Sequence, residues 1–297
     1  MQEPLVGTEA GAGAWASDFF GGLNALPPEA IAVLTQVLEA MATQPGFQQA
    51  RRAMVHELGL AAGSRVLDGG CGTGAALADL AEVVGTQGQI VGVDPTTAFI
   101  ARARQRAAEA GIPNAVYQTG DVRSLPFSDG TFDAALCDKV LIHVGPPGAV
   151  LGELVRVTKP GGRVGALEWQ PHFFLSTTRP QLESRFNGVF RQAMHNLCAA
   201  ANLPRYFREA GLTDIRTHTD LISTDDLDDH PFWRVFVVDQ LPAFVQAGLL
   251  EAEEGRELAA DLEQLGAHGE FRAAFVVVHA VGTRPGVRVD ERVPGSG

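Results

Sequence analysis

The order of apolar and polar positions predicts a repeated strand–helix pattern in the middle of the chain. Short apolar runs alternate there with segments of helical periodicity. The expected strands are Arg65–Gly69, Ile90–Asp94, Ala115–Thr119, Phe132–Cys137 and Arg163–Trp169. The expected helices are Gly74–Val84, Thr97–Ala110 and Pro147–Thr158. Strands and helices that alternate at this spacing favour a parallel, doubly wound sheet with helices on both faces.

Helical patterns precede this region. Pro27-Pro28-Glu29 begins a predicted helix, because proline suits a first helical turn. Its apolar positions recur at helical spacing, at Ile31, Leu34, Leu38 and Met41. A second helix is predicted over Phe47–Leu58. Residues 1–25 are rich in Gly and Ala and are expected to be irregular.

The C-terminal part has a different pattern. Thr213–Ser223 alternates weakly, and Phe271–Val281 is rich in β-branched and aromatic residues, so both are predicted strands. An acidic stretch, Thr224–His230, and a helical pattern over Leu241–Leu265 lie between them. Residues 286–297 are expected to form a disordered tail.

Composition narrows the class of protein. The chain has 297 residues, 45% of them hydrophobic, and a formal net charge of −12. This balance provides a sizeable core and argues against nucleic acid as a partner, which needs a basic face. The start of the chain lacks the basic and apolar regions of a secretory signal, and no 18-residue apolar run exists. We therefore expect a soluble cytoplasmic protein with no membrane partner; a monomer and a homodimer both remain open.

The cysteines point to neither disulfides nor zinc. Cys71, Cys137 and Cys198 are odd in number and far apart, and no CxxC or Cys/His ligand spacing is present. No metal site is expected.

The run Val66-Leu67-Asp68-Gly69-Gly70-Cys71-Gly72-Thr73-Gly74 is the most informative motif. It predicts a buried strand that ends in a glycine-rich turn before a helix. Asp94 ends the next strand 20 residues after the last glycine, and this combination is typical of a nucleotide-binding edge of a parallel sheet.

The glycines alone do not identify the nucleotide. Gly70 to Ala75 also satisfies the dinucleotide pattern G-x-G-x-x-A, so a nicotinamide-dependent oxidoreductase is one alternative. Asp68 argues against it, because a carboxylate there would repel a pyrophosphate and would hold a cationic amino group. Asp121, after the third strand, offers an acceptor for an adenine amino group.

Together the motifs resemble the class I S-adenosylmethionine-dependent methyltransferases. The matching runs are Val66 to Gly74, Val91-Gly92-Val93-Asp94, Gly120-Asp121-Val122, Leu125-Pro126-Phe127, Phe132-Asp133 and Lys159-Pro160-Gly161-Gly162. The chain is most similar to the small-molecule branch that includes the ubiquinone and menaquinone biosynthesis methyltransferases (methyltransferase type 11-like). The likeness covers residues 47–170 well and the rest weakly.

The resemblance implies an α/β fold: a Rossmann-like, doubly wound, seven-stranded mixed sheet whose last two strands break the parallel order. It also implies an N-terminal helical cap over 1–60 and a cofactor-binding core over 61–170. Residues 171–285 would supply a helical lid insertion, at about 171–265, and the closing strands of the same domain.

The resemblance also assigns roles around the cofactor S-adenosyl-L-methionine. Asp68, Gly70, Cys71 and Gly72 would surround its methionine part, where Cys71 acts as a small filler. Asp94 would bind both ribose hydroxyls, since one carboxylate accepts two hydrogen bonds. The other expected cofactor-binding residues are Pro95 and Thr96 beside the adenosine, Asp121 and Val122 at the adenine, Cys137 and Asp138 beside the methionine, and Arg51 at the cofactor's carboxylate.

Each of these functional roles has an alternative in which the residue is purely structural. Asp68 could cap the turn that follows it, and Arg51 could be a solvated helix residue. His143 follows the fourth strand and is the expected catalytic base for a phenol, enol or amine, unless it only packs locally. His172 and Glu168 are weaker candidates for that base. Direct methyl transfer needs no nucleophile, so alignment can supply most of the catalysis.

The acceptor is expected to be an apolar or aromatic small molecule. Of the chain's 21 aromatic residues, eleven lie between Trp169 and Phe244. The family builds its acceptor pocket from the N-terminal helices and from insertions after the fifth strand, and an aromatic-rich wall would suit such an acceptor. The eleven residues are Trp169, Phe173, Phe174, Phe186, Phe190, Tyr206, Phe207, Phe232, Trp233, Phe236 and Phe244. The alternative is that most of them form core beneath the lid.

The function expected is methyl transfer from S-adenosylmethionine to an O, N or C atom of such a molecule, as in secondary metabolism. A first alternative is a cofactor-binding enzyme on the same scaffold that catalyses a cyclisation or rearrangement without net methyl transfer. A second is a non-catalytic module with a degenerate site, against which the intact glycine loop and acids argue.

Overall fold

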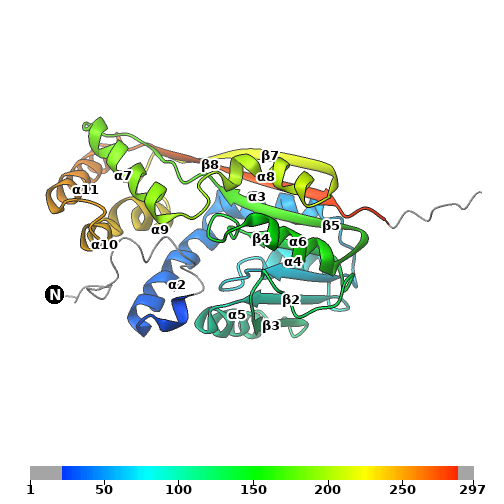
Figure 1. Ribbon diagram of the computed structural model, residues 1–297. Helices are drawn as coiled ribbons and strands as arrows, with labels where there is room; N and C mark the ends of the chain where they lie inside the picture. The colour runs from blue at the N-terminus through cyan, green and yellow to red at the C-terminus, as the bar shows by residue number, and fades with distance from the viewer. Residues whose placement is uncertain (1–21, 287–297) are drawn as a thin grey trace, which may run out of the picture.

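The computed structural model describes residues 22–286. Figure 1 shows a twisted sheet with helices on both faces and further helices gathered at one end. The helices are η1 (Leu23–Ala25), α2 (Pro28–Thr43), α3 (Pro45–Glu57), α4 (Leu77–Val84), α5 (Thr97–Glu109), α6 (Pro147–Val157), α7 (Pro180–Ala193), α8 (Ala199–Glu209), α9 (Pro231–Arg234), the π-helical turn η2 (Val235–Asp239), α10 (Leu241–Gln246) and α11 (Ala252–Ala267). The strands are β1 (Arg65–Gly69), β2 (Gln89–Asp94), β3 (Ala115–Thr119), β4 (Phe132–Asp138), β5 (Thr158–Trp169), β6 (Phe174–Leu175), β7 (Thr213–Thr224) and β8 (Ala273–Thr283).

The sheet has the order β3-β2-β1-β4-β5-β8, with β7 paired to the far edge of β8. The strands β1 to β5 pair in parallel, and β8 runs antiparallel to both β5 and β7. The predicted doubly wound mixed sheet is therefore confirmed. Of the two closing strands, only β8 runs against the parallel direction, whereas β7 has the direction of β5.

The predicted number of seven strands is wrong, because the described residues form eight. The additional strand is β6, which pairs Phe174 and Leu175 with the start of β8. β5 pairs with β8 only from Val277 onward. The beginning of β8 would leave backbone groups unpaired along that edge, and β6 supplies their partners.

The central strands are apolar because helices cover them on both sides. α3, α4 and α5 pack on one face, and α6 and α8 pack on the other. Val66 and Leu67 of β1 are completely buried although they point to opposite faces, as expected for a strand inside a parallel sheet.

Local chemistry explains where several elements begin. Gln44 caps α3, since its side chain accepts a hydrogen bond from Phe47 N at 3.0 Å, and the helix begins at Pro45. The helix predicted from Gly74 starts only at Leu77, because Gly74 has a φ of +80° and still belongs to the loop. β5 begins at Thr158, before the predicted Arg163.

The helices of region 171–265 pack at two different places in the fold. α7, α9, α10 and α11 gather at the end of the sheet near α2, whereas α8 packs on β5, β7 and β8. The helix predicted over Leu241–Leu265 is two helices, and a capping box between Glu251 and Glu254 starts the second. We call α7 and α9–α11, with η2, the lid.

Most of the aromatic residues after β5 are core. Trp169 packs against Phe173, Phe190, Phe236 and Phe275 with ring centroids 5.7 to 6.0 Å apart. These edge-to-face contacts join the lid to β5 and β8.

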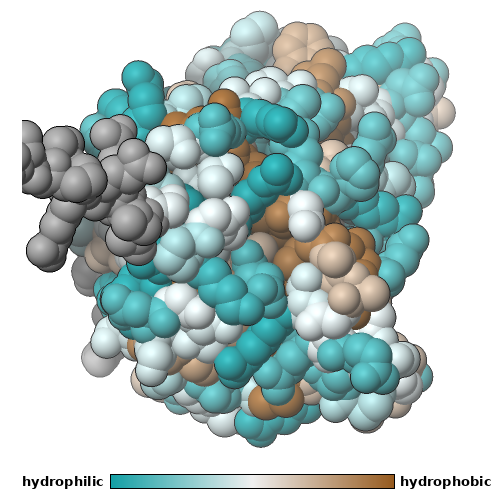
Figure 2. Space-filling model, turned by 90° about the vertical axis from the view of Figure 1, so that its right-hand side faces the viewer, coloured by the Kyte–Doolittle hydropathy of each residue, from teal (hydrophilic) through white to brown (hydrophobic). Residues whose placement is uncertain are grey.

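The two ends of the sheet differ. The parallel strands end on the side of α2 and the lid (Figure 1). Figure 2 shows the opposite end, where hydrophilic residues predominate around a hydrophobic area. Within residues 22–286, no helix is long and apolar enough to cross a membrane. Residues 1–21, most of the segment expected to be irregular, and 287–297 of the expected tail lie outside the described range.

Candidate functional site

A cavity of about 430 Å³ lies where the parallel strands end. It lies at the switch point of the strand order. From β1 the chain adds β2 and β3 on one side, and it then returns to add β4 and β5 on the other side of β1. Open α/β sheets bind ligands at such a point. One wall consists of sheet-edge residues, and α2 and the lid form the other.

The glycine-rich loop after β1 is held tightly against the sheet. Gly70 and Gly72 have φ values of +75° and +51°, which favour glycine. Gly70 N and Cys71 N both donate to Val93 O of β2, at 2.7 and 3.0 Å. A Cβ on Gly70 would lie 2.4 Å from Val140 Cγ2. The loop therefore brings backbone, and no side chain, to the cavity at Gly70.

Asp94 fixes this loop from the end of β2. Its Oδ2 accepts a hydrogen bond from Gly72 N at 3.0 Å, and its Oδ1 accepts one from Thr96 N at 2.8 Å. Burial raises the pKa of the carboxyl, and the two backbone donors oppose that rise. Each oxygen keeps a further lone pair, so the carboxylate can accept two more donors from a ligand in the cavity.

Asp68 is a buried carboxyl group at the floor of the cavity. Its residue is 3% exposed, and its Oδ1 has no hydrogen-bond partner within the described part of the chain. Burial raises the pKa of Asp68 to about 7, and the charge of Asp138 adds to the rise. A buried carboxylate oxygen without a hydrogen-bond partner is costly, so this position favours a cationic ligand group that can donate to it.

Asp138, at the end of β4, is paired with two cations. It accepts a 2.7 Å hydrogen bond from Arg51 Nε of α3 and a hydrogen bond from the Lys139 ammonium. Burial disfavours the Asp138 carboxylate, but Lys139 and Arg51 outweigh it and lower its pKa. The Arg51 side chain is 1% exposed, which excludes a solvated residue, and its Nη1 lies 3.7 Å from Asp79 Oδ2.

The cavity brings together most of the predicted site residues. Those that line it are Asp68, Gly70, Cys71, Gly72, Asp94, Pro95, Asp121, Val122, Asp138 and His143. Asp121 is paired with Arg123, whose hydrogen bonds lower its pKa.

Three predicted residues, all in the described range, do not line the cavity: Arg51, Thr96 and Cys137. Arg51 lies behind Asp138, Thr96 acts through its backbone N–H on Asp94, and Cys137 is fully buried in β4. Cys71 lines the cavity as a buried thiol whose pKa burial raises well above its usual value.

The candidate bases differ in environment. His143 lies beside the cavity, and burial together with the Lys139 charge lowers its pKa to about 3. Glu168 is fully buried away from the cavity and accepts a 2.6 Å hydrogen bond from Leu141 N. Burial raises the pKa of Glu168 to about 8. His172 is exposed and does not border the cavity.

The sequence-based prediction did not name Lys139 or the aliphatic members of the apolar wall, although it expected the N-terminal helices and the segment after the fifth strand to form the acceptor pocket. Lys139 directly follows Cys137-Asp138 and has a φ of +59°, with its ammonium 4.8 Å from the centre of the Phe47 ring. Its position at the end of a predicted strand was an available signal. The apolar wall comes from α2, α7 and η2 and contains Leu34, Val37, Leu38, Met41, Phe190, Met194 and Phe236. Trp169, Phe190 and Phe236 are the members of the predicted aromatic set that reach the cavity.

Comparison with known proteins agrees with this architecture. A family model described as "Methyltransferase domain" matches residues 60–211, just over half of the chain. In structure, the chain is similar to the YcgJ protein of Bacillus subtilis, with a TM-score of 0.57 and 20% identity over 80% of this chain and 99% of that one. This structural likeness concerns the fold.

Two curated relatives illustrate the likeness in sequence. Demethylmenaquinone methyltransferase from Beutenbergia cavernae is 38% identical over 137 residues, which cover 43% of this chain and 54% of that protein. Sterol 24-C-methyltransferase from Schizosaccharomyces pombe is 28% identical over 180 residues, which cover 60% and 45%. The chain thus spans about half the length of the curated relatives it matches. Because the family model matches more than half of the chain, the chain belongs to the methyltransferase domain family.

Proposed function

We propose that this protein transfers the methyl group of S-adenosyl-L-methionine to an O, N or C atom of an apolar or aromatic small molecule. The observation that carries the proposal is the buried, partnerless Oδ1 of Asp68, which lines the same cavity as Asp94. A carboxylate there suits the cationic amino group of this cofactor and would repel the pyrophosphate of a nicotinamide dinucleotide.

The remaining lining residues fit the other parts of the cofactor. Asp94 has lone pairs for the two ribose hydroxyls while its backbone donors hold it in place. Asp121 and Val122 lie on the same wall and would meet the adenine amino group and ring. Arg51 is a positioning residue in this proposal, because its cation reaches the site through Asp138.

The apolar wall supports the proposed class of acceptor. It consists largely of aliphatic and aromatic side chains from α2, α7 and η2, opposite the acidic sheet edge. Such a wall favours a molecule with a large apolar surface. The names of the two curated relatives, which refer to a menaquinone precursor and a sterol, agree with that class.

Methyl transfer requires little from the protein beyond alignment of the two reacting molecules. When bound, the cofactor supplies an activated methyl group on its sulfonium, and the chain has to orient the acceptor atom in line with it. His143 borders the cavity, and with a pKa of about 3 it stays neutral at pH 7. A neutral imidazole can accept a hydrogen bond from a hydroxyl group of the molecule to be methylated. Full proton transfer to so weak a base is unfavourable.

Incubation of the protein with S-adenosylmethionine and candidate aromatic and polyketide-like acceptors tests the proposal. Methyl transfer would yield S-adenosylhomocysteine and a product heavier by about 14 Da, because CH₃ replaces H in the displacement. An isomeric product with the cofactor intact would favour a cyclisation or rearrangement instead. Binding of NADH and not of S-adenosylmethionine would contradict both.

A further inference from the structure

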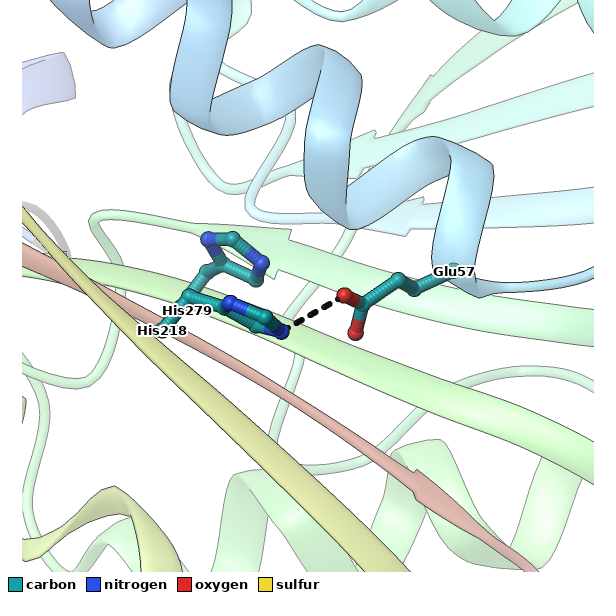
Figure 3. A group of neighbouring side chains, drawn as sticks. All are labelled: Glu57, His218 and His279. Carbon is teal, nitrogen blue, oxygen red and sulfur yellow. Dashed lines mark ion pairs between the residues drawn. The ribbon is translucent and has the colours of Figure 1, made fainter.

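A second cluster of ionisable side chains lies away from the cavity. It consists of Glu57 at the end of α3, His218 on β7 and His279 on β8. None of the three lines the cavity described above. Figure 3 shows the three side chains meeting in the space between the helix and the two strands.

The two histidines face each other across the closing strands. His218 and His279 are directly paired in the antiparallel register of β7 and β8, so their side chains lie on the same face of the sheet. Their rings stack with centroids 4.9 Å apart and an interplanar angle of 18°. Glu57 completes the group, with its Oε1 2.8 Å from His218 Nε2.

His279 is the residue of this cluster that most favours a bound ligand, because it is buried without hydrogen-bond partners. It is 2% exposed, yet neither ring nitrogen has a hydrogen-bond partner in residues 22–286, and Glu57 Oε2 is likewise buried without one. A buried imidazole with both nitrogens unsatisfied is costly. An imidazole nitrogen that has no hydrogen-bond partner is available as a metal ligand.

We propose that Glu57, His218 and His279 form a binding site for a divalent transition-metal ion, with Zn²⁺ as the representative. Two imidazoles and one carboxylate suit zinc and its neighbours, whereas Ca²⁺ and Mg²⁺ prefer oxygen ligands alone. Three protein ligands leave a fourth tetrahedral position for water.

Metal binding requires the three ligand atoms to move closer together, and the nearly parallel imidazole rings require one ring to rotate. One ligand atom from each residue lies within 4.8 Å of the others. Bonds of about 2.0–2.2 Å to a tetrahedral Zn²⁺ place ligand atoms roughly 3.3 Å apart. The His218 side chain is 52% exposed, so it can rotate toward the ion and leaves a path for the ion to enter.

A metal ion at this site would link three separate elements of the fold. It joins the last residue of α3 to both closing strands, and α3 also carries Arg51 to Asp138. Negative partial charge at a helix C-terminus further favours a cation beside Glu57. Sequence spacing could not indicate this site, since residues 57, 218 and 279 are far apart along the chain.

Calorimetric titration of the full chain with Zn²⁺ tests the proposal, using protein without a polyhistidine tag that has been stripped with EDTA and desalted. We expect one Zn²⁺ per chain and a rise in Tm on binding. Co²⁺ should give the visible absorption of a tetrahedral site. His218→Ala and Glu57→Gln should each weaken Zn²⁺ binding by at least about 100-fold, because even groups that only hydrogen-bond to a metal ligand are worth about 10- to 100-fold.

His56→Ala is the matched control, since His56 is an exposed histidine on α3 next to Glu57. It should bind Zn²⁺ like the parent protein. His279→Phe fills the buried volume and should abolish binding; if it does not fold, the half-exposed His218 decides the question. Absence of Zn²⁺ binding, or equal binding by His218→Ala, would overturn the proposal. The measurement needs no methyl acceptor, so failure of the proposed methyl transfer leaves it intact.

Discussion

Arg51 Nε of α3 donates a 2.7 Å hydrogen bond to Asp138 Oδ2 at the end of β4, and both side chains are at most 8% exposed. The pair connects the N-terminal helices to the strand end that borders the cavity. Lys139 also bonds to Asp138, so this carboxylate stays ionised although it is buried. The cavity thereby combines an ionised acid, Asp138, with a second acid, Asp68, whose pKa is about 7.

Replacement of Arg51 should destabilise the fold. Arg51→Met keeps most of the volume but removes a buried cation from Asp138 and Asp79, and breaking a buried pair typically costs about 3–5 kcal/mol. Arg52→Ala is the control: its side chain is 66% exposed and also pairs with Asp79, so we expect a loss of about 1 kcal/mol or less. Urea unfolding measures both, and equal losses would contradict a structural role for the Arg51 pair.

Asp94→Asn should weaken S-adenosylmethionine binding by about 100-fold. The amide loses the charge that holds Gly72 N and Thr96 N, and hydrogen bonds to charged groups are worth about 1.5–3 kcal/mol each. Asp121→Asn should lose less than tenfold, because its side chain is 45% exposed and already paired with Arg123. Calorimetric titration compares the two. Unchanged affinity in Asp94→Asn would refute the ribose assignment.

Gly70→Ala should disrupt the loop more than a left-handed conformation alone explains. The new methyl group would lie 2.4 Å from Val140, in addition to the strain at a φ of +75°. Gly111→Ala, just after the end of α5, has a comparable φ of +65° but no atom within 4 Å of the added Cβ, so it isolates the backbone cost, about 1–2 kcal/mol. Thermal unfolding should show a clearly larger loss of Tm for Gly70→Ala, and similar losses would mean that the loop adapts.

The affinity for S-adenosylmethionine should depend on pH through Asp68. A proton on this carboxyl competes with the cationic amino group, and its pKa in the free protein is about 7. Affinity should therefore rise about tenfold per pH unit below 7 and level off above it. Asp68→Asn should bind more weakly and lose this dependence. Titrations between pH 5.5 and 8 measure both proteins; a parent affinity that falls as the pH rises would contradict the assignment.

Much of the core and of the cavity's acidic edge could be predicted from local patterns. A strand buried on both faces must be a short apolar run, as at Val66 and Leu67, and its turn must be glycine-rich where φ is positive. Because parallel strands end at one edge, Asp68, Asp94 and Asp138 were expected together, and all three line the cavity.

Tertiary structure alone decided which distant side chains meet. The pairing of Arg51 with Asp138 joins residues 87 positions apart, and the Glu57–His218–His279 cluster joins one helix end to two strands. The apolar wall depends on how α2 and the lid pack, and short β6 depends on the length of β8 beyond β5. Periodicity records only which side of an element is buried. Local sequence patterns therefore specify the elements and the sheet edge that borders the cavity. Packing between elements selects which side chains meet, because burial free energy is not directional and does not specify partners.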